Sequence, residues 1–162
     1  MKYALLLSIL FSNTLFSQST KNLDITNGYK DLKFNMPFEL ILKKTKAKKS
    51  DNQIFGTTTY DIKNDKYTNF GRFHAEIIII QDNADGSLLE FFFTMDKHGR
   101  KEYLELASYF MGLYGNPTIN DQSKSTYKWM GRKVMIALSY SDKVKQCNFN
   151  IMNLSKVRKA QQ

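Results

Sequence analysis

The clearest periodic pattern in the chain is an apolar stripe over residues 100–114. Apolar side chains recur there at intervals of three and four residues: Tyr103, Leu106, Ala107, Phe110 and Leu113. This spacing places them on one face of a helix. Gly115 and Pro117 follow, and we expect them to end the helix, because glycine accepts a left-handed C-cap and proline has no backbone N–H to donate.

A shorter helix is predicted directly after Asn35. Asn35 is a suitable N-cap, and Pro37 suits the first helical turn. The apolar positions of this segment are Phe38, Leu40, Ile41 and Leu42, and lysines follow them. Basic side chains at that point favour a helix end, because they interact well with the negative end of the helix dipole.

Six further segments have the composition of strands, rich in Thr, Ile and Phe or alternating between apolar and polar, and turn-forming residues separate them. They are residues 54–62, 72–81, 88–95, 126–130, 133–140 and 146–153. Three segments follow each predicted helix, so the order of elements is helix, strand, strand, strand, repeated. We therefore expect an α+β fold, a two-layer sandwich in which an antiparallel sheet of about six to seven strands carries two helices on one face.

The first 18 residues have the layout of a secretory signal peptide. Lys2 is followed by an apolar run over residues 3–11 and then by small polar residues. The run is about half of the roughly 20 residues that cross a bilayer, and no second such run follows. We expect cleavage near Ser17 or Gln18, a secreted or periplasmic protein, and no transmembrane segment after cleavage. Residues 19–162 would form a single α+β domain of two similar halves, about 30–96 and 97–155.

The composition of the 162 residues narrows the class further. Hydrophobic residues make up 42% and charged residues 24%, which excludes a disordered, collagen-like or disulfide-stapled chain. The single cysteine, Cys147, shares its predicted strand face with Phe149 and Ile151. We expect a buried, unreactive thiol there, because a nucleophilic cysteine needs a depressed pKa and a nearby base.

The element order resembles that of the secreted tandem-repeat proteins typified by the β-lactamase inhibitory protein, and more loosely the small SmpA-type outer-membrane assembly lipoproteins. The resemblance rests on the helix entry Phe34-Asn35-Met36-Pro37-Phe38-Glu39 and on the exit Tyr114-Gly115-Asn116-Pro117 followed by Tyr127-Lys128-Trp129. It implies a fold and a habit of binding other proteins, with no specific partner. The chain lacks the disulfides of the first family and the lipid-bearing cysteine of the second.

No catalytic residue, cofactor or metal site is predicted. His98 lies between a strand end and a helix start, as a turn residue would. His74 shares a predicted strand face with Glu76, but two ligands are fewer than the four of a structural zinc site. The loop 82–87 has Ala84 where a calcium loop needs an oxygen ligand, so we expect a hairpin turn with Gly86 at its tight point. A small secreted hydrolase with an unrecognised site is one alternative.

The most concentrated charge feature of the chain, whose formal net charge is +9, is one lysine-rich run. Its members are Lys43, Lys44, Lys46, Lys48 and Lys49. Such a run suits binding of an anionic lipid or polysaccharide of the envelope, and this binding is a second alternative function. The run also suits a solvated helix end with no ligand. The expected export disfavours nucleic acid, and we expect no nucleic-acid partner.

The two segments 72–81 and 88–95 each have one fully apolar face and one mixed face. We expect the apolar faces to pack beneath the helices, which leaves the mixed faces on an open sheet surface. The residues of that surface would be His74, Glu76, Ile78, Ile80, Leu88, Glu90 and Phe92. An apolar patch rimmed by charges is typical of protein-binding surfaces. We therefore expect a non-catalytic module of the bacterial envelope that binds another protein, either as an inhibitor or as an assembly accessory. The competing explanation is that the N-terminal segment or a dimer partner covers this surface.

Overall fold

The structure is a computed structural model, which describes residues 22–51, 56–70, 72–96 and 99–157. Over these residues the fold is α+β, with one eight-stranded antiparallel sheet, two two-stranded sheets and five helices. This confirms the expected class and the antiparallel sheet. The predicted signal peptide and His98 lie outside the described residues.

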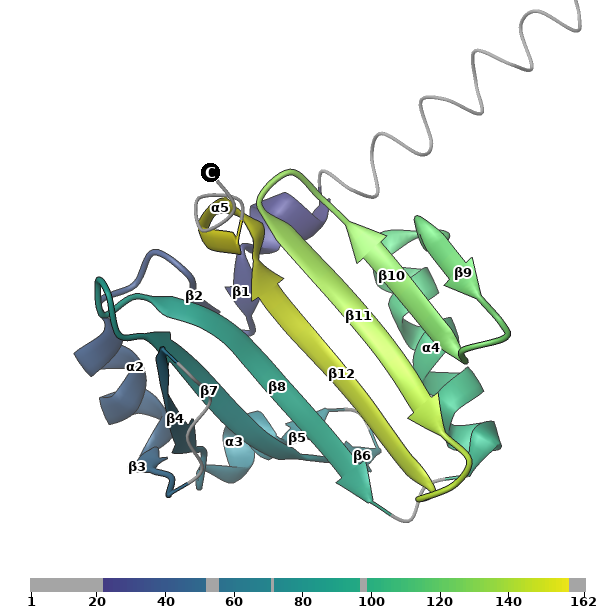
Figure 1. Ribbon diagram of the computed structural model, residues 1–162, viewed down its shortest axis with the longest axis horizontal. Coiled ribbons are helices and arrows are strands. Elements are labelled where there is room, and N and C mark those ends of the chain that lie inside the picture. Colours follow the sequence, from purple (N-terminus) through teal and green to yellow (C-terminus); the bar gives the residue numbers. More distant parts are fainter. Residues whose placement is uncertain (1–21, 52–55, 71, 97–98, 158–162) are drawn as a thin grey trace, which may run out of the picture.

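The main sheet has the strand order β3-β4-β7-β8-β12-β11-β10-β9, and every neighbouring pair is antiparallel (Figure 1). Its strands are β3 (Lys48–Lys49), β4 (Thr57–Asp61), β7 (Glu76–Asp82), β8 (Leu88–Asp96), β9 (Ile119–Asp121), β10 (Thr126–Met130), β11 (Val134–Ser141) and β12 (Gln146–Asn153). The sheet is wider than the six to seven strands expected, because two short strands, β3 and β9, form its edges.

Two short hairpins lie outside the main sheet. One pairs β1 (Gly28–Tyr29) with β2 (Leu32–Lys33), and the other pairs β5 (Asn69–Phe70) with β6 (Phe73–His74). The second hairpin divides the strand predicted over residues 72–81, whose first part belongs to β6 and whose second part belongs to β7.

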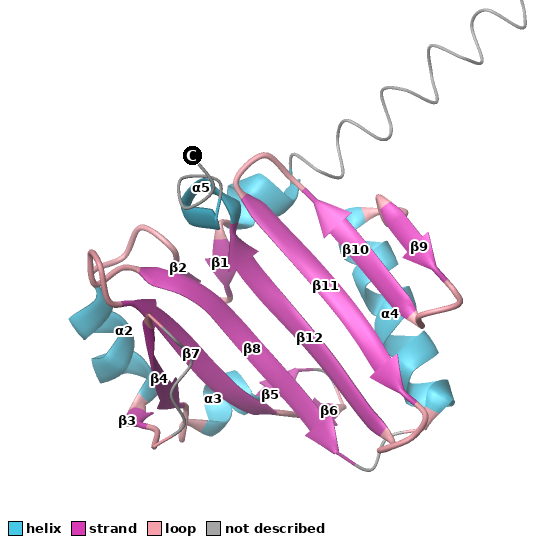
Figure 2. Cartoon of the chain, viewed as in Figure 1, coloured by secondary structure: helices cyan, strands magenta, loops and turns pink. Residues whose placement is uncertain are grey.

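Three helices lie against one face of the main sheet: α2 (Phe38–Thr45), α3 (Asp65–Thr68) and α4 (Arg100–Tyr114). In Figures 1 and 2 they lie behind the strands, and the other face of the sheet is turned toward the viewer. Helix α4 has the predicted bounds. Helix α2 begins later than expected, because Pro37 and not Asn35 occupies its N-cap. Two more short helices, residues 22–26 and α5 (Leu154–Val157), bring the total in the described residues above the expected two.

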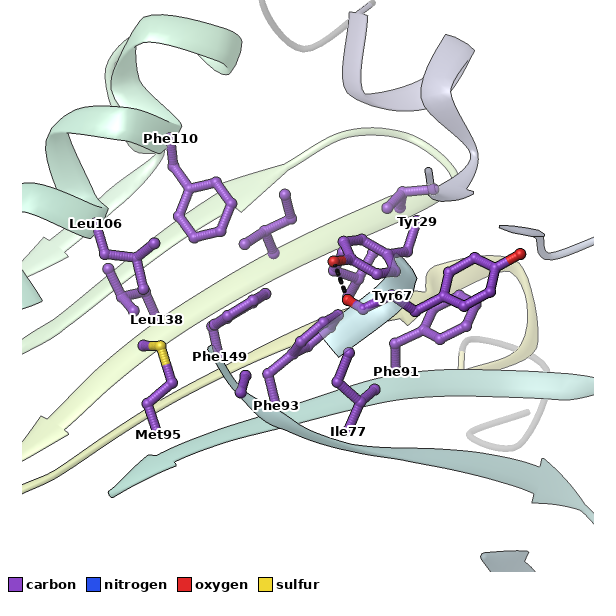
Figure 3. Packing of buried hydrophobic residues seen from close by; sticks show 14 of the residues in the cluster. Tyr29, Tyr67, Ile77, Phe91, Phe93, Met95, Leu106, Phe110, Leu138 and Phe149 are labelled. Carbon is purple, nitrogen blue, oxygen red and sulfur yellow. Dashed lines mark hydrogen bonds between the residues drawn. The ribbon is translucent and has the colours of Figure 1, made fainter. Parts of the chain in front are cut away.

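The hydrophobic core fills the space between the helices and the sheet (Figure 3). At its centre the rings of Phe93 on β8 and Phe149 on β12 stack, with centroids 3.9 Å apart and planes 11° from parallel. Tyr29 is buried nearby, and its hydroxyl donates to the backbone oxygen of Tyr67 at 2.7 Å, which satisfies a polar group that would be costly to bury alone. Since Phe93 is on β8 and Phe149 is on β12, their stacking adds a side-chain contact between the two middle strands of the sheet.

The helix at residues 22–26 holds the turn between β10 and β11. Asp24 accepts backbone hydrogen bonds from Arg132 and Lys133, each at 2.8 Å, and from Val134 at 3.2 Å. Leu23 is 1% exposed and anchors the helix in the core. A Cβ at Gly131 would lie 2.3 Å from Asp24 Oδ1, so a side chain at this position would displace the carboxylate that holds the turn.

No helix among the described residues is long and apolar enough to cross a membrane.

The open face of the main sheet

The strand registers define which side chains lie on the face that the helices leave uncovered, which we call the open face. Along it, residues paired directly across the strands form three rows. The first row is Met130, Met135, Met152, Glu90, Ile80 and Thr59; the second is Lys128, Ala137, Asn150, Phe92, Ile78 and Asp61; the third is Thr126, Ser139, Asn148, Thr94 and Glu76. The first row contains three methionines, and the third row contains mainly hydroxyl and amide side chains.

Five of the seven residues predicted for the protein-binding surface lie on this face: Glu76, Ile78, Ile80, Glu90 and Phe92. Ile78 pairs directly with Phe92, and both side chains are half-buried. Ile80 is 8% exposed but does not belong to the core cluster beneath the helices. We call Ile78, Ile80 and Phe92 the apolar patch.

Leu88 was expected on the open face, and the structure places it in the core instead. Ile80 pairs with Glu90, but the next residue of β7, Gln81, pairs with Leu88, so Leu89 is an extra residue in β8. This bulge reverses the alternation of the strand before Glu90. Leu88 is therefore 1% exposed and packs in the hydrophobic core.

His74 was expected beside Glu76 on one strand, and the structure places it on the separate hairpin, in β6. Its side chain is exposed, and its Nδ1 lies 2.7 Å from the amide oxygen of Asn69 on the paired strand. His74 does not share a strand with Glu76 because the chain leaves β6 at Ala75, which is buried.

A cavity of about 490 Å³ lies where β4, α3 and β6 meet the start of β7. Its polar lining includes Asp61, Asp65, His74 and Glu76. The structure thus brings His74 and Glu76 to one cavity, but the hydrogen bond of His74 that the structure shows goes to the amide of Asn69 and not to a carboxylate. Among the described residues, no group of three or more His, Cys, Asp or Glu side chains could hold a metal ion.

Glu90 is the most enclosed carboxylate of the open face. It pairs with Ile80 on one side and with Met152 on the other, and its Oε1 accepts a hydrogen bond of 2.7 Å from Asn150 Nδ2. Burial raises the pKa of the Glu90 carboxyl above its usual value, and the hydrogen bond from Asn150 opposes that shift. Glu90 and Asn150 form a polar pair between the apolar patch and the methionines.

The charged neighbours of the apolar patch are mainly acidic, although the whole chain carries a formal net charge of +9. Asp61 and Glu90 pair directly with Ile78 and Ile80, and Glu76 lies two residues before Ile78 on β7. At the sheet edge Lys48 pairs with Asp61. The residues that pair directly with Ile78 and Ile80 thus include two carboxylates, Asp61 and Glu90.

The lysine-rich run is divided among three local structures. Lys43 and Lys44 lie in the last turn of α2, and Lys44 Nζ is 2.9 Å from Asp31 Oδ2. Lys46 forms the left-handed C-cap of that helix, with φ 53°. Lys48 and Lys49 form the exposed edge strand β3. Lysines on an exposed edge strand hinder its pairing with other chains.

The loop 82–87 forms the hairpin turn expected from its sequence. Gly86 has φ 69°, and its N–H donates to the backbone oxygen of Asp82 at 2.9 Å. Asp82 and Asp85 side chains accept from backbone N–H groups two residues ahead, at 2.9 and 3.0 Å. Asp85 also forms an ion pair with Lys156, and these contacts lower the pKa of Asp85 to about 2.

Cys147 is fully buried, as expected. It faces the core on β12, and burial raises the pKa of its thiol from 9.0 to about 12. The neutral thiol is a poor nucleophile, so no covalent chemistry is assigned to it.

The side chains that β10, β11 and β12 contribute to the open face were not predicted from the sequence; Met130, Met135, Asn150 and Met152 are among them. A signal for them exists, since each lies next to a core residue of the same strand, such as Trp129, Ile136 or Ile151. Period-two alternation therefore places them on the opposite face. Their position relative to one another follows only from the strand registers.

Comparisons with protein-family models, curated proteins and solved structures found no match to the chain.

Proposed function

We propose that this protein is an exported, non-catalytic binding module of the bacterial envelope, secreted or periplasmic, that binds another protein through the open face of its main sheet. The observation that supports this most is the cross-strand pair of Ile78 and Phe92, with Ile80 beside it. Apolar side chains occupy the middle of a sheet face that the described helices leave uncovered. Half-buried apolar side chains at the centre of such a face suit a protein interface.

The acidic rim defines the chemistry of the partner. Asp61, Glu76 and Glu90 lie beside the apolar patch within a chain of net charge +9. A partner surface with apolar side chains at its centre and basic side chains around them complements this arrangement. Anionic surfaces are disfavoured at the same face, because they would meet carboxylates there.

The proposal includes the export and the repeat organisation expected from the sequence. We propose that residues 1–18 are removed on export and that the remaining chain is one domain of two similar halves. In this layout α2 with β4, β7 and β8 forms one unit, and α4 with β10, β11 and β12 forms the other. The pairing of β8 with β12 joins the two units at the middle of the sheet.

The experiment compares two double variants in pull-downs from an envelope extract of the producing cells. Ile78→Lys with Phe92→Lys removes the apolar pair and adds charge that repels a basic partner. Leu104→Lys with Leu113→Lys is the matched control, because both leucines are 46% exposed on α4, on the helical side of the molecule.

We expect the control variant to retain the partners of the unmodified protein and the open-face variant to lose at least one of them. Circular dichroism and thermal unfolding verify that both variants are folded. Unchanged partners with a folded open-face variant would contradict the proposal. Light scattering tests whether a second copy of this chain covers the open face instead. If the unmodified protein is a dimer and the open-face variant is a monomer, the face is a self-interface and the proposed partner is wrong.

A further inference from the structure

Three methionines occupy directly paired positions on neighbouring strands of the open face. Met130 on β10 pairs with Met135 on β11, and Met135 pairs with Met152 on β12. All three side chains are half-buried. Their strand neighbours Trp129 and Ile136 lie in the core, so the three thioethers lie together on the other side of the sheet.

The spacing of the strands allows the three sulfurs to converge. Neighbouring strands lie about 4.8 Å apart, so the backbones of Met130 and Met152 are separated by about 10 Å with Met135 between them. Methionine is unbranched and has three rotatable bonds, which lets each side chain turn toward the middle of the row. A single small ion above Met135 is therefore within reach of all three side chains.

The backbone beneath this row is held in place. Asp24 accepts hydrogen bonds from Arg132, Lys133 and Val134, the residues between Met130 and Met135. The backbone N–H of Met130 also donates to Thr118 Oγ1 at 3.1 Å. A fixed backbone lowers the cost of ordering ligand side chains around an ion.

We propose that Met130, Met135 and Met152 bind one Cu(I) ion through their three thioether sulfurs. Thioethers are soft, uncharged donors, which select Cu(I) over the hard ions that prefer oxygen. Glu90 pairs with Met152 and places a carboxyl group beside the row, which favours a cation there. Lys128 is a basic residue on the same face, two residues from Met130, and it opposes this effect. This inference is independent of the proposed protein partner.

The test measures how much Cu(I) the purified protein withdraws from bicinchoninate under anaerobic conditions. We expect one equivalent of Cu(I) per chain. Met135→Leu should lower the affinity at least about tenfold, since loss of a direct ligand costs more than loss of a supporting residue. The triple variant Met130→Leu, Met135→Leu, Met152→Leu should withdraw none, and it should fold because leucine is close to methionine in volume.

Two variants control for other sulfur ligands. Met111→Leu changes a half-buried methionine of α4, and Cys147→Ala removes the buried thiol; both should bind Cu(I) as the unmodified protein does. Failure of the unmodified protein to withdraw Cu(I), or equal withdrawal by the triple variant, would overturn the proposal. A second readout is the ¹³C-methyl spectrum of the methionines, in which Cu(I) should shift the three signals of the row and leave that of Met111 in place. Shifts confined to other methionines would overturn it as well.

Discussion

The carboxylate of Asp24 accepts a hydrogen bond of 2.8 Å from the backbone N–H of Lys133, across a sequence separation of 109 residues. The same carboxylate binds the N–H groups of Arg132 and Val134. It thereby satisfies the backbone of the β10–β11 turn as an N-cap side chain satisfies the start of a helix. The helix at residues 22–26 thus holds the turn between β10 and β11.

Replacement of Asp24 by alanine tests this relationship. Asp24→Ala leaves three backbone N–H groups of the turn without their acceptor and should lower the free energy of unfolding by about 2 kcal/mol. Urea denaturation measures the loss. Asp51→Ala, at an exposed position, is the control and should change stability by less than about 0.5 kcal/mol. Equal stability of the two variants would show that the turn does not need the carboxylate.

Truncation of the central aromatic stack should be more costly. Phe149 is 2% exposed and stacks on Phe93, so Phe149→Ala should lower the free energy of unfolding by about 3–5 kcal/mol. Phe92→Ala changes the neighbouring strand on the open face, where the ring is half-buried, and should cost less than half as much. Chemical denaturation of both variants measures the difference. A larger loss for Phe92→Ala would mean that the open face, and not the helical side, holds the main core.

Stability at low pH should depend on Asp31. A hydrogen bond from Lys44, followed by one from Lys66, holds the pKa of the Asp31 carboxyl well below its usual value, although partial burial opposes the shift. The folded state therefore favours the charged carboxylate, which stabilises the protein above the ordinary pKa of about 3.9 and loses this effect as pH falls below it. The Asp31 side chain is 40% exposed, so solvent screening limits the contribution to about 1 kcal/mol or less.

The measurement compares Asp31→Asn with the unmodified protein by urea denaturation from pH 7 down to pH 2. We expect the variant to be less stable at pH 7 and the difference to shrink below about pH 4. A difference that grew on acidification would contradict the assigned direction of the pKa shift.

The thiol of Cys147 should be unreactive while the protein is folded. Its pKa of about 12 and its full burial leave almost no accessible thiolate at pH 8. A chromogenic disulfide reagent should therefore label the protein slowly in buffer and rapidly in denaturant. Rapid labelling of the folded protein would mean that β12 opens or that the thiol faces solvent.

Local patterns in the sequence predicted much of the fold. The helix over residues 100–114 was predicted with its true bounds, because its apolar stripe, Gly115 and Pro117 all indicate the same element. The strands at residues 126–130 and 146–153 were likewise predicted with their true bounds. In each case the information lies within the segment itself.

The errors arise where contacts between distant segments decide the structure. The bulge at Leu89 moves Leu88 into the core, and only the pairing of β8 with β7 shows it. Two other features also depend on contacts between distant segments. Asp24 accepts hydrogen bonds from the β10–β11 turn, and strand pairing aligns Met130 with Met135 and Met152. For the same reason the apolar patch was predicted in outline, and the methionines beside it were missed.

We propose that the apolar patch of the open face contacts another protein. A photo-crosslinking amino acid, p-benzoylphenylalanine, placed at Phe92 in the producing cells tests it most directly, with the same residue at the exposed Leu104 of α4 as the control. We expect a crosslink to a different protein from position 92 and none from position 104. Absence of a crosslink from position 92, or a crosslink only to a second copy of this chain, would contradict it.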